Sequence, residues 1–91
     1  MYKIFEVENL NFYIKFDLIN GEYIPHMLHR HSVSIEQAIT TFFNITKQDY
    51  NSTNMRYEAY SRDTNITIYY TYKHNNQNEI LLITAIQENE Q

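Results

Sequence analysis

The stretch SIEQAITTFFN, residues 34–44, gives the strongest indication of the fold. Its apolar residues recur at the i, i+3, i+4 and i+7 spacing of one helix face: Ile35, Ala38, Ile39 and Phe42. Ser34 precedes this pattern and Gln37 lies three residues further on, which is the spacing of a capping box. The pattern predicts a helix from Ser34 to about Asn44, with an apolar stripe that must be buried against a sheet or another protein. Phe43 widens that stripe, and Thr41 is expected to lie away from it.

The residues before this helix alternate between apolar and polar side chains, which predicts strands at residues 2–7 and 11–18. Asn20-Gly21 comes next and is a strong signal for a two-residue hairpin turn, because both positions take a positive φ. A return strand over residues 22–24 is expected to stop at Pro25, which has no N–H to donate to a sheet. Residues 26–33 fit either a short helical turn or a loop.

The residues after the helix predict a three-stranded meander. Residues 44–54 are polar and typical of a loop, although Thr46 followed by Asp49 also allows a short helix. Strands are expected at 55–61, 66–73 and 79–87. The middle strand is amphipathic, with residues 66, 68, 70 and 72 forming its core face, and the last strand is apolar on both faces, as in a central strand. Residues after Glu88 are expected to fray.

These elements predict an α+β fold: an antiparallel sheet of five to six strands in β-β-β-α-β-β-β order, with one main helix packed on one face. The 91 residues are expected to form a single domain, 1–91, because two smaller cores would not offset the entropy of the chain. A hydrophobic share of 43% is far above the range of disordered proteins.

Composition excludes several classes of protein. The chain has no cysteine, so disulfides, thiolate metal sites and cysteine nucleophiles are absent. Its longest apolar run, residues 80–83, is much shorter than a membrane span, and the first residues lack the apolar core of a signal peptide, so we expect a cytoplasmic protein. Asn, Ile and Tyr make up 32 of the 91 residues, and Gly, Pro and Ala only 5, which indicates an AT-rich genome such as that of a low-GC Gram-positive bacterium or its phages.

Three histidines, His26, His29 and His31, form the densest chemical cluster in the sequence. A metal site would use these imidazoles with Glu22 or Glu36 as a carboxylate ligand. The spacing matches no known ligand signature, however, and only the first two histidines would share a helix face. Exposed histidines on a connector are the simpler interpretation, so we expect no metal and no cofactor.

Nine tyrosines are more than a small core needs, because each buried hydroxyl requires a hydrogen-bond partner. The second face of the strand at 66–73 carries Thr67, Tyr69 and Thr71, and Tyr60 lies on the neighbouring strand. Together they predict a partly exposed patch of the kind found in protein interfaces. Ordinary strand propensity is the alternative explanation.

The charge balance argues against direct binding of nucleic acid. Seven Lys and Arg stand against eleven Asp and Glu, with no basic run to neutralise phosphates. An acidic face that imitates phosphates would suit a protein partner that normally holds nucleic acid. The simpler explanation of the net charge of −4 is solubility.

One segment carries a family resemblance. Residues 30–38, Arg30-His31-Ser32-Val33-Ser34-Ile35-Glu36-Gln37-Ala38, resemble the signature KHGVSFEEA of BrnT toxins, which belong to the RelE-like ribonuclease superfamily. Phe16-Asp17 is similar to an early aromatic–acidic pair of that family. The order of elements over residues 16–86 is also similar. In place of the basic residues that end the family's last strand, this chain has Ile86-Gln87-Glu88.

Two main hypotheses about function result. The first is a small acidic, non-catalytic inhibitor or regulator that occupies a partner protein's surface. It would be encoded by a phage or mobile element, as anti-defence, anti-CRISPR and immunity-type proteins are. The second follows from the resemblance, which implies an endoribonuclease toxin of a toxin–antitoxin pair, with His31 as general acid or base, Arg30 beside it, and Arg56 holding phosphate. A structural subunit without separate activity is a third possibility.

Overall fold

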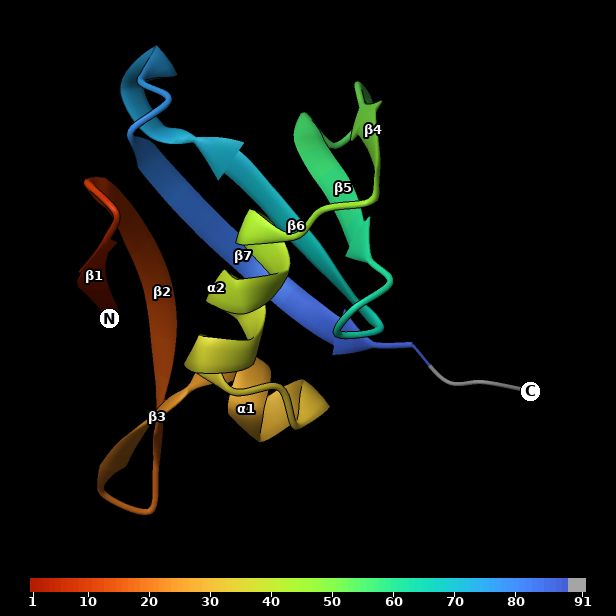
Figure 1. Ribbon diagram of the computed structural model, residues 1–91. Coiled ribbons are helices and arrows are strands. Elements are labelled where there is room, and N and C mark those ends of the chain that lie inside the picture. Colours follow the sequence, from red (N-terminus) through yellow and green to blue (C-terminus); the bar gives the residue numbers. More distant parts are fainter. Residues whose placement is uncertain (89–91) are drawn as a thin grey trace.

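The capping box that the sequence predicts begins the main helix in the computed structural model, which describes residues 1–88 (Figure 1). Ser34 Oγ accepts a hydrogen bond from the Gln37 backbone N–H at 3.0 Å, and Gln37 Oε1 accepts one from the Ser34 N–H at 2.9 Å. Helix α2 therefore spans Ile35–Phe43, with Asn44 as its C-cap. The expected fraying after Glu88 concerns residues outside the described part of the chain.

The fold is α+β, and residues 1–88 form seven strands and two α-helices. In chain order the elements are β1 (Tyr2–Val7), β2 (Leu10–Ile19), β3 (Glu22–Pro25), α1 (His26–His31), α2 (Ile35–Phe43), β4 (Lys47–Asn51), β5 (Arg56–Ser61), β6 (Ile66–Tyr72) and β7 (Glu79–Gln87), with a 3₁₀ turn at Lys73–Asn75. The hairpin turn at Asn20-Gly21 is confirmed, with φ values of 51° and 85°. Among the described residues, no helix is both long enough and apolar enough to cross a membrane.

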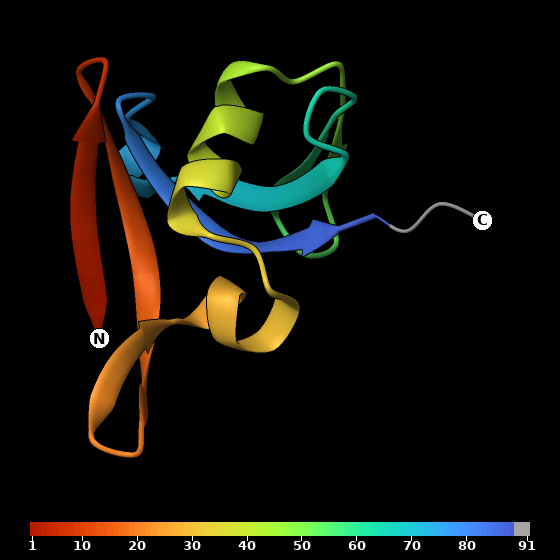
Figure 2. The ribbon, with the colours of Figure 1, turned by 60° about the horizontal axis from the view of Figure 1, so that its bottom comes forward.

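The strands form one mixed, mostly antiparallel sheet in the order β1-β2-β7-β6-β5-β4, with β3 paired to the second half of β2. Strand β7 is central, as its apolar faces predict. It runs parallel to β2 over residues 11–14 and 79–82. Beyond that segment β2 and β7 diverge, and α1 lies in the opening between them, where its Met27 is buried (Figure 1 and Figure 2).

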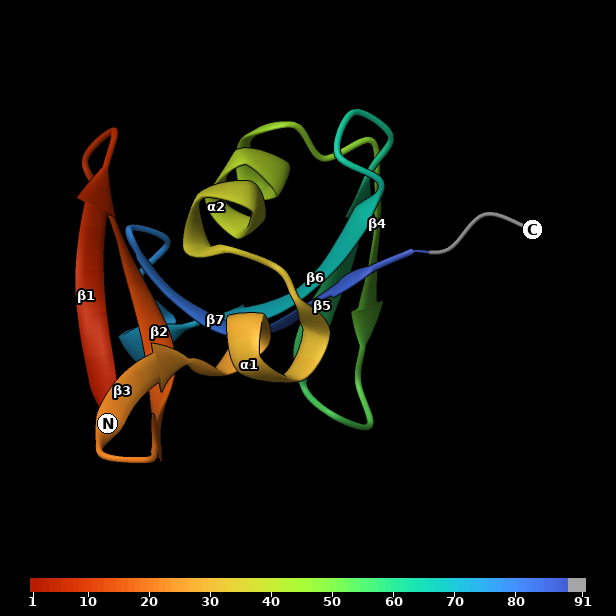
Figure 3. The ribbon, with the colours of Figure 1, turned by 90° about the horizontal axis from the view of Figure 1, so that it is seen from below.

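The sheet curves around α2, which lies inside the curve (Figure 3). The core between them consists of the buried apolar residues of one sheet face and of the two helices: Phe12, Ile14, Phe16, Met27, Val33, Ala38, Ile39, Ala59, Ile66, Ile68, Tyr70, Ile80, Leu82 and Ala85. The expected core face of β6 is confirmed for Ile66, Ile68 and Tyr70, whereas Tyr72 is partly buried and packs against this core. The opposite, convex face across β5 and β6 is not covered by α2, whereas α1 packs against β7 (Figure 3).

Several expectations about the elements were wrong. Residues 47–51 form strand β4 instead of a loop or a short helix, because they pair with β5 at the edge of the sheet. Residues 26–31 form helix α1, which confirms the helical alternative for this segment. The β2–β7 pairing is parallel and β4 adds a strand, so the sheet is larger and less uniform than predicted.

Two residues of α2 also differ from the prediction. Thr41 is fully buried, and its hydroxyl is satisfied there, because it donates to the Gln37 carbonyl at 2.8 Å and lies 2.6 Å from the Thr64 hydroxyl. Phe43, at the end of the helix, widens the apolar stripe only in part, because its ring contacts Phe12 but is 43% exposed.

Candidate protein-binding face

The sheet brings the four predicted interface residues, Tyr60, Thr67, Tyr69 and Thr71, onto its convex face. In β6 the buried residues alternate with Thr67, Tyr69 and Thr71, which are all partly exposed. Tyr60 lies directly opposite Thr67 on the neighbouring strand β5. We call these four residues, with the strand positions beside them on the same side of the sheet, the convex face.

Tyr69 lies near the middle of this face. Its cross-strand neighbours are Glu58 on β5 and Thr84 on β7. The guanidinium of Arg56 lies 4.5 Å from the centre of the Tyr69 ring, a cation–π distance, and the Arg56 Nε contacts the Glu58 carboxylate at 3.3 Å. Among the described residues the Tyr69 hydroxyl makes no hydrogen bond. The ring is therefore held in place by its neighbours while its polar end is available to a partner.

Tyr60 and Thr67 are held by polar contacts within the protein. The Tyr60 hydroxyl donates to the Asn65 side-chain oxygen at 2.7 Å, and the Thr67 hydroxyl donates to the Glu88 carboxylate at 2.5 Å. These bonds fix the positions of both side chains, so a partner would meet a pre-organised surface at this end of the convex face.

A shallow hollow of about 490 Å³ lies beside Tyr60 and Thr67. Three carboxylates line it, Asp49, Glu58 and Glu88, together with the ammonium of Lys47. Arg56 offsets the charge of Glu58, so that Asp49 and Glu88 outweigh the single lysine. This end of the convex face is consequently suited to a basic group.

The other end of the convex face is closed by a carboxylate that joins the parallel strands. Glu79 of β7 accepts hydrogen bonds from the Asn11 amide at 2.7 Å and from the Tyr13 hydroxyl at 2.6 Å, both on β2. The hydrogen bond from Tyr13 lowers the pKa of Glu79, and the same bond raises the pKa of Tyr13. The Lys73 ammonium lies 4.4 Å from the centre of the Tyr13 ring. These contacts stabilise the β2–β7 pairing.

The fold brings two residues of the histidine cluster, His26 and His31, to one hollow, and His29 does not line it. His26 Nδ1 lies 2.7 Å from the Asp17 carboxylate, and this hydrogen bond lowers the pKa of Asp17. His26 and His31 line a hollow of about 340 Å³ with Lys15, where β2 and β7 diverge. Within residues 1–88, no three side chains of the kinds that bind metals come together.

The three residues of the ribonuclease hypothesis do not share one pocket. His31 lines the hollow beside Lys15, but neither Arg30 nor Arg56 does. Arg30 is exposed on α1, where adjacent helical positions point in different directions. Arg56 lies on β5 over the Tyr69 ring and is paired with Glu58. Arg56 therefore lies over a ring whose cross-strand neighbour Thr84 lines the hollow that contains His31, but Arg56 itself does not line it.

Sequence reasoning missed the Asp17–His26 pair and the contribution of Lys15. A signal for the pair was present, because a two-residue turn at Asn20-Gly21 places Asp17 opposite Ile24, two residues before His26. Lys15 is two residues before Asp17 on β2, so the two side chains lie on the same side of the sheet. The Thr84 hydroxyl, which also belongs to this hollow, is buried without a hydrogen-bond partner in the described structure, and no pattern in the sequence indicated it.

In comparisons with protein-family models, curated proteins and solved structures, none matches this chain. The geometry of its surfaces therefore carries the functional interpretation.

Proposed function

We propose that this protein is a small, non-catalytic inhibitor or regulator that acts by occupying the surface of a partner protein with its convex face. The observation that carries the proposal is the position of Tyr69. It lies partly exposed near the middle of a sheet face that α2 does not cover, its ring held by Arg56 and its hydroxyl unbonded among the described residues. Tyrosines in such positions contribute strongly to protein interfaces.

The charge of the surface favours a basic partner. The hollow beside Tyr60 carries the acidic side chains of Asp49 and Glu88, and the whole chain has a net charge of −4. A protein that normally binds nucleic acid presents a basic surface, which would be complementary to this acidic hollow. Phage-encoded inhibitors and immunity-type proteins are the class of function that this arrangement fits best.

The test is capture of a partner from a host lysate with immobilised protein, compared between two tyrosine variants. Tyr69→Ala should lose the partner, because it removes the central ring of the convex face. Tyr23→Ala is the matched control, since Tyr23 is 52% exposed but lies on β3, away from β6. Recovery of the same partner with both variants, or of no specific partner with the unmodified protein, would contradict the proposal.

Salt provides a second measurement. If acidic side chains steer the encounter, the association rate should fall as ionic strength rises. Screening by salt limits the reach of surface charges to about 8–10 Å at physiological ionic strength. The dissociation rate should change much less, because the contacts that the Tyr69 ring makes in the complex do not depend on long-range charge. An association rate independent of salt would contradict the electrostatic part of the proposal.

The RelE-like endoribonuclease remains a second candidate, and one observation favours it. His31, the residue that the resemblance singles out, lines the hollow that also contains Lys15 and the Asp17-bonded His26. Incubation of the purified protein with labelled RNA at neutral pH tests this function. We expect no cleavage. Cleavage that disappears in His31→Ala while the fold persists would replace the binding function by the catalytic one.

A further inference from the structure

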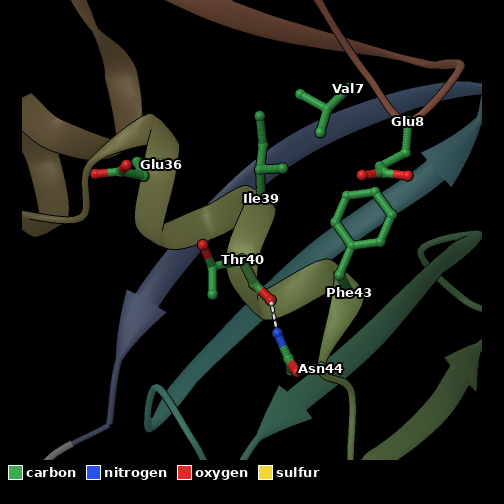
Figure 4. A pocket seen from close by; sticks show the side chains of 7 residues that line it. All are labelled: Val7, Glu8, Glu36, Ile39, Thr40, Phe43 and Asn44. Atoms are coloured by element: carbon green, nitrogen blue, oxygen red, sulfur yellow. Dashed lines mark hydrogen bonds between the residues drawn. The ribbon is translucent and has the colours of Figure 1, made fainter.

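Another hollow lies on the side opposite the convex face, between the β1–β2 turn and helix α2 (Figure 4). Its volume is about 540 Å³, and it is lined by Val7, Glu8, Glu36, Ile39, Thr40, Phe43 and Asn44. We call it the α2 groove. No residue of the convex face lines it, so the groove is independent of the function proposed above.

The floor of the α2 groove is apolar and firmly supported. Val7 and Ile39 face each other across it, and the Phe43 ring lies at one end (Figure 4). Although Phe43 is 43% exposed, its ring makes edge contacts with Phe12 at 6.0 Å and Phe42 at 5.6 Å between ring centres. The core thus holds an exposed aromatic ring in place, and a ligand would not have to order it.

Carboxylates lie at the two ends of the groove. Glu8 is beside the Phe43 ring, and Glu36 is at the opposite end, in the first turn of α2 (Figure 4). Both side chains are exposed, and neither forms an ion pair with another described residue. The lining contains no lysine, arginine or histidine. The groove therefore combines an apolar floor with uncompensated negative charge.

The turn that carries Glu8 is not optimised for its own stability. Glu8 and Asn9 form a two-residue turn between β1 and β2, with φ values of 55° and 66°. Asn, Asp and Gly are favoured at the first position of such a turn, because a glutamate side chain gains no local hydrogen bond there. Local strain of this kind is typical of positions that serve a function other than folding.

We propose that the α2 groove is a second protein-binding site, which takes a basic amphipathic segment of a partner. An apolar side chain of that segment would pack against Val7, Ile39 and Phe43. Lysine or arginine residues on either side of it would pair with Glu8 and Glu36. Segments of this type bind apolar grooves through a few regularly spaced anchors.

The binding test uses a fluorescent 14-residue synthetic peptide in which leucines on one face are flanked by lysines. Two further peptides serve as controls, one with the leucines replaced by serines and one with the lysines replaced by glutamates. Only the basic amphipathic peptide should bind, as measured by fluorescence anisotropy. Equal binding of the serine peptide would show that charge alone attracts it, and this result would overturn the proposal.

Protein variants separate the groove from the general negative charge of the chain. The double variant Glu8→Gln, Glu36→Gln should weaken binding of the basic peptide at least about tenfold. The control variant Glu22→Gln, Asp63→Asn changes the net charge equally at two exposed sites outside the groove and should stay within about twofold. Equal losses in the two variants would overturn the proposal.

Thr40 allows a test in both directions, since it is exposed in the groove and both replacements suit a helix. Thr40→Lys should weaken binding of the basic peptide and Thr40→Glu should strengthen it, with melting temperatures of both variants confirming the fold. If the control peptide that carries glutamates also bound more weakly to Thr40→Lys and more strongly to Thr40→Glu, this result would contradict the proposal. A dimer in sedimentation experiments that dissociates in Thr40→Lys would identify a second copy as the occupant and would also overturn it.

Discussion

Phe42 joins α2 to the sheet through aromatic contacts on both sides. Its ring lies edge-on to Phe12 and to Tyr70, with 5.2 Å between ring centres in each pair. We expect Phe42→Ala to lower the free energy of unfolding by about 3 kcal/mol, through lost burial and a cavity in the core. The urea denaturation midpoint measures this change. Phe43→Ala is the matched control and should cost only about 1 kcal/mol, because that ring is 43% exposed. Equal costs would show that Phe42 is not a core residue.

Glu8 offers a stability prediction of the opposite sign. At its φ of 55°, asparagine is better tolerated than glutamate, so Glu8→Asn should raise the free energy of unfolding by about 0.5 kcal/mol. The same variant should weaken binding of the basic peptide in the α2 groove. Thermal denaturation and fluorescence anisotropy of one sample measure both effects. A variant that is less stable than the parent would show that the glutamate supports the turn.

At the scale of elements, two carboxylates that are sensitive to acid join separate parts of the fold: Glu79 joins β7 to β2, and Asp17 joins β2 to α1 through His26. Hydrogen bonds hold the pKa of Glu79 and that of Asp17 below their ordinary values. Each ionised carboxylate therefore stabilises the fold at pH values above its pKa in the unfolded protein. This contribution is lost as the pH falls through the lower pKa that the group has in the folded protein. We expect the melting temperature to be steady between about pH 5 and 7 and to fall below about pH 4. Tyr13→Phe removes the hydrogen bond that most lowers the pKa of Glu79. The melting temperature of this variant should therefore fall less at acidic pH than that of the parent protein. An identical acid slope in the variant would contradict this assignment.

The elements that the sequence predicts well are those with local signals. The Ser34–Gln37 capping box and the Asn20-Gly21 turn each depend on residues within three positions of one another, and both are present. Strand β4 was missed because its sequence, KQDYN, lacks apolar alternation, and its pairing with β5 supplies the order instead. The parallel contact of β2 with β7 joins Asn11 to Glu79 across most of the chain, and no local pattern reports such a contact.

The same distinction applies to the candidate sites. Alternation along β6 was sufficient to place Thr67, Tyr69 and Thr71 on one face, because side chains of a strand alternate between its two sides. The α2 groove was not predicted, since it forms only where the β1–β2 turn meets α2. Hollows of this kind depend on how elements pack, which periodicity does not describe.

At the scale of the whole molecule, the sheet separates two surfaces of different character. The convex face presents tyrosine and threonine beside an acidic hollow, and the opposite side presents the α2 groove. The two surfaces share no lining residue, so variants of one should leave binding at the other unchanged. A loss of peptide binding in Tyr69→Ala, with the fold intact, would contradict this independence.

The most direct measurement is the dissociation constant of the captured partner for the parent protein, Tyr69→Ala and Tyr23→Ala, with the melting temperature of each variant recorded. A central interface tyrosine contributes about 2 kcal/mol, so Tyr69→Ala should bind about thirtyfold more weakly, while Tyr23→Ala should match the parent within about twofold. A dissociation constant for Tyr69→Ala equal to that of the parent would show that the convex face is not the binding surface.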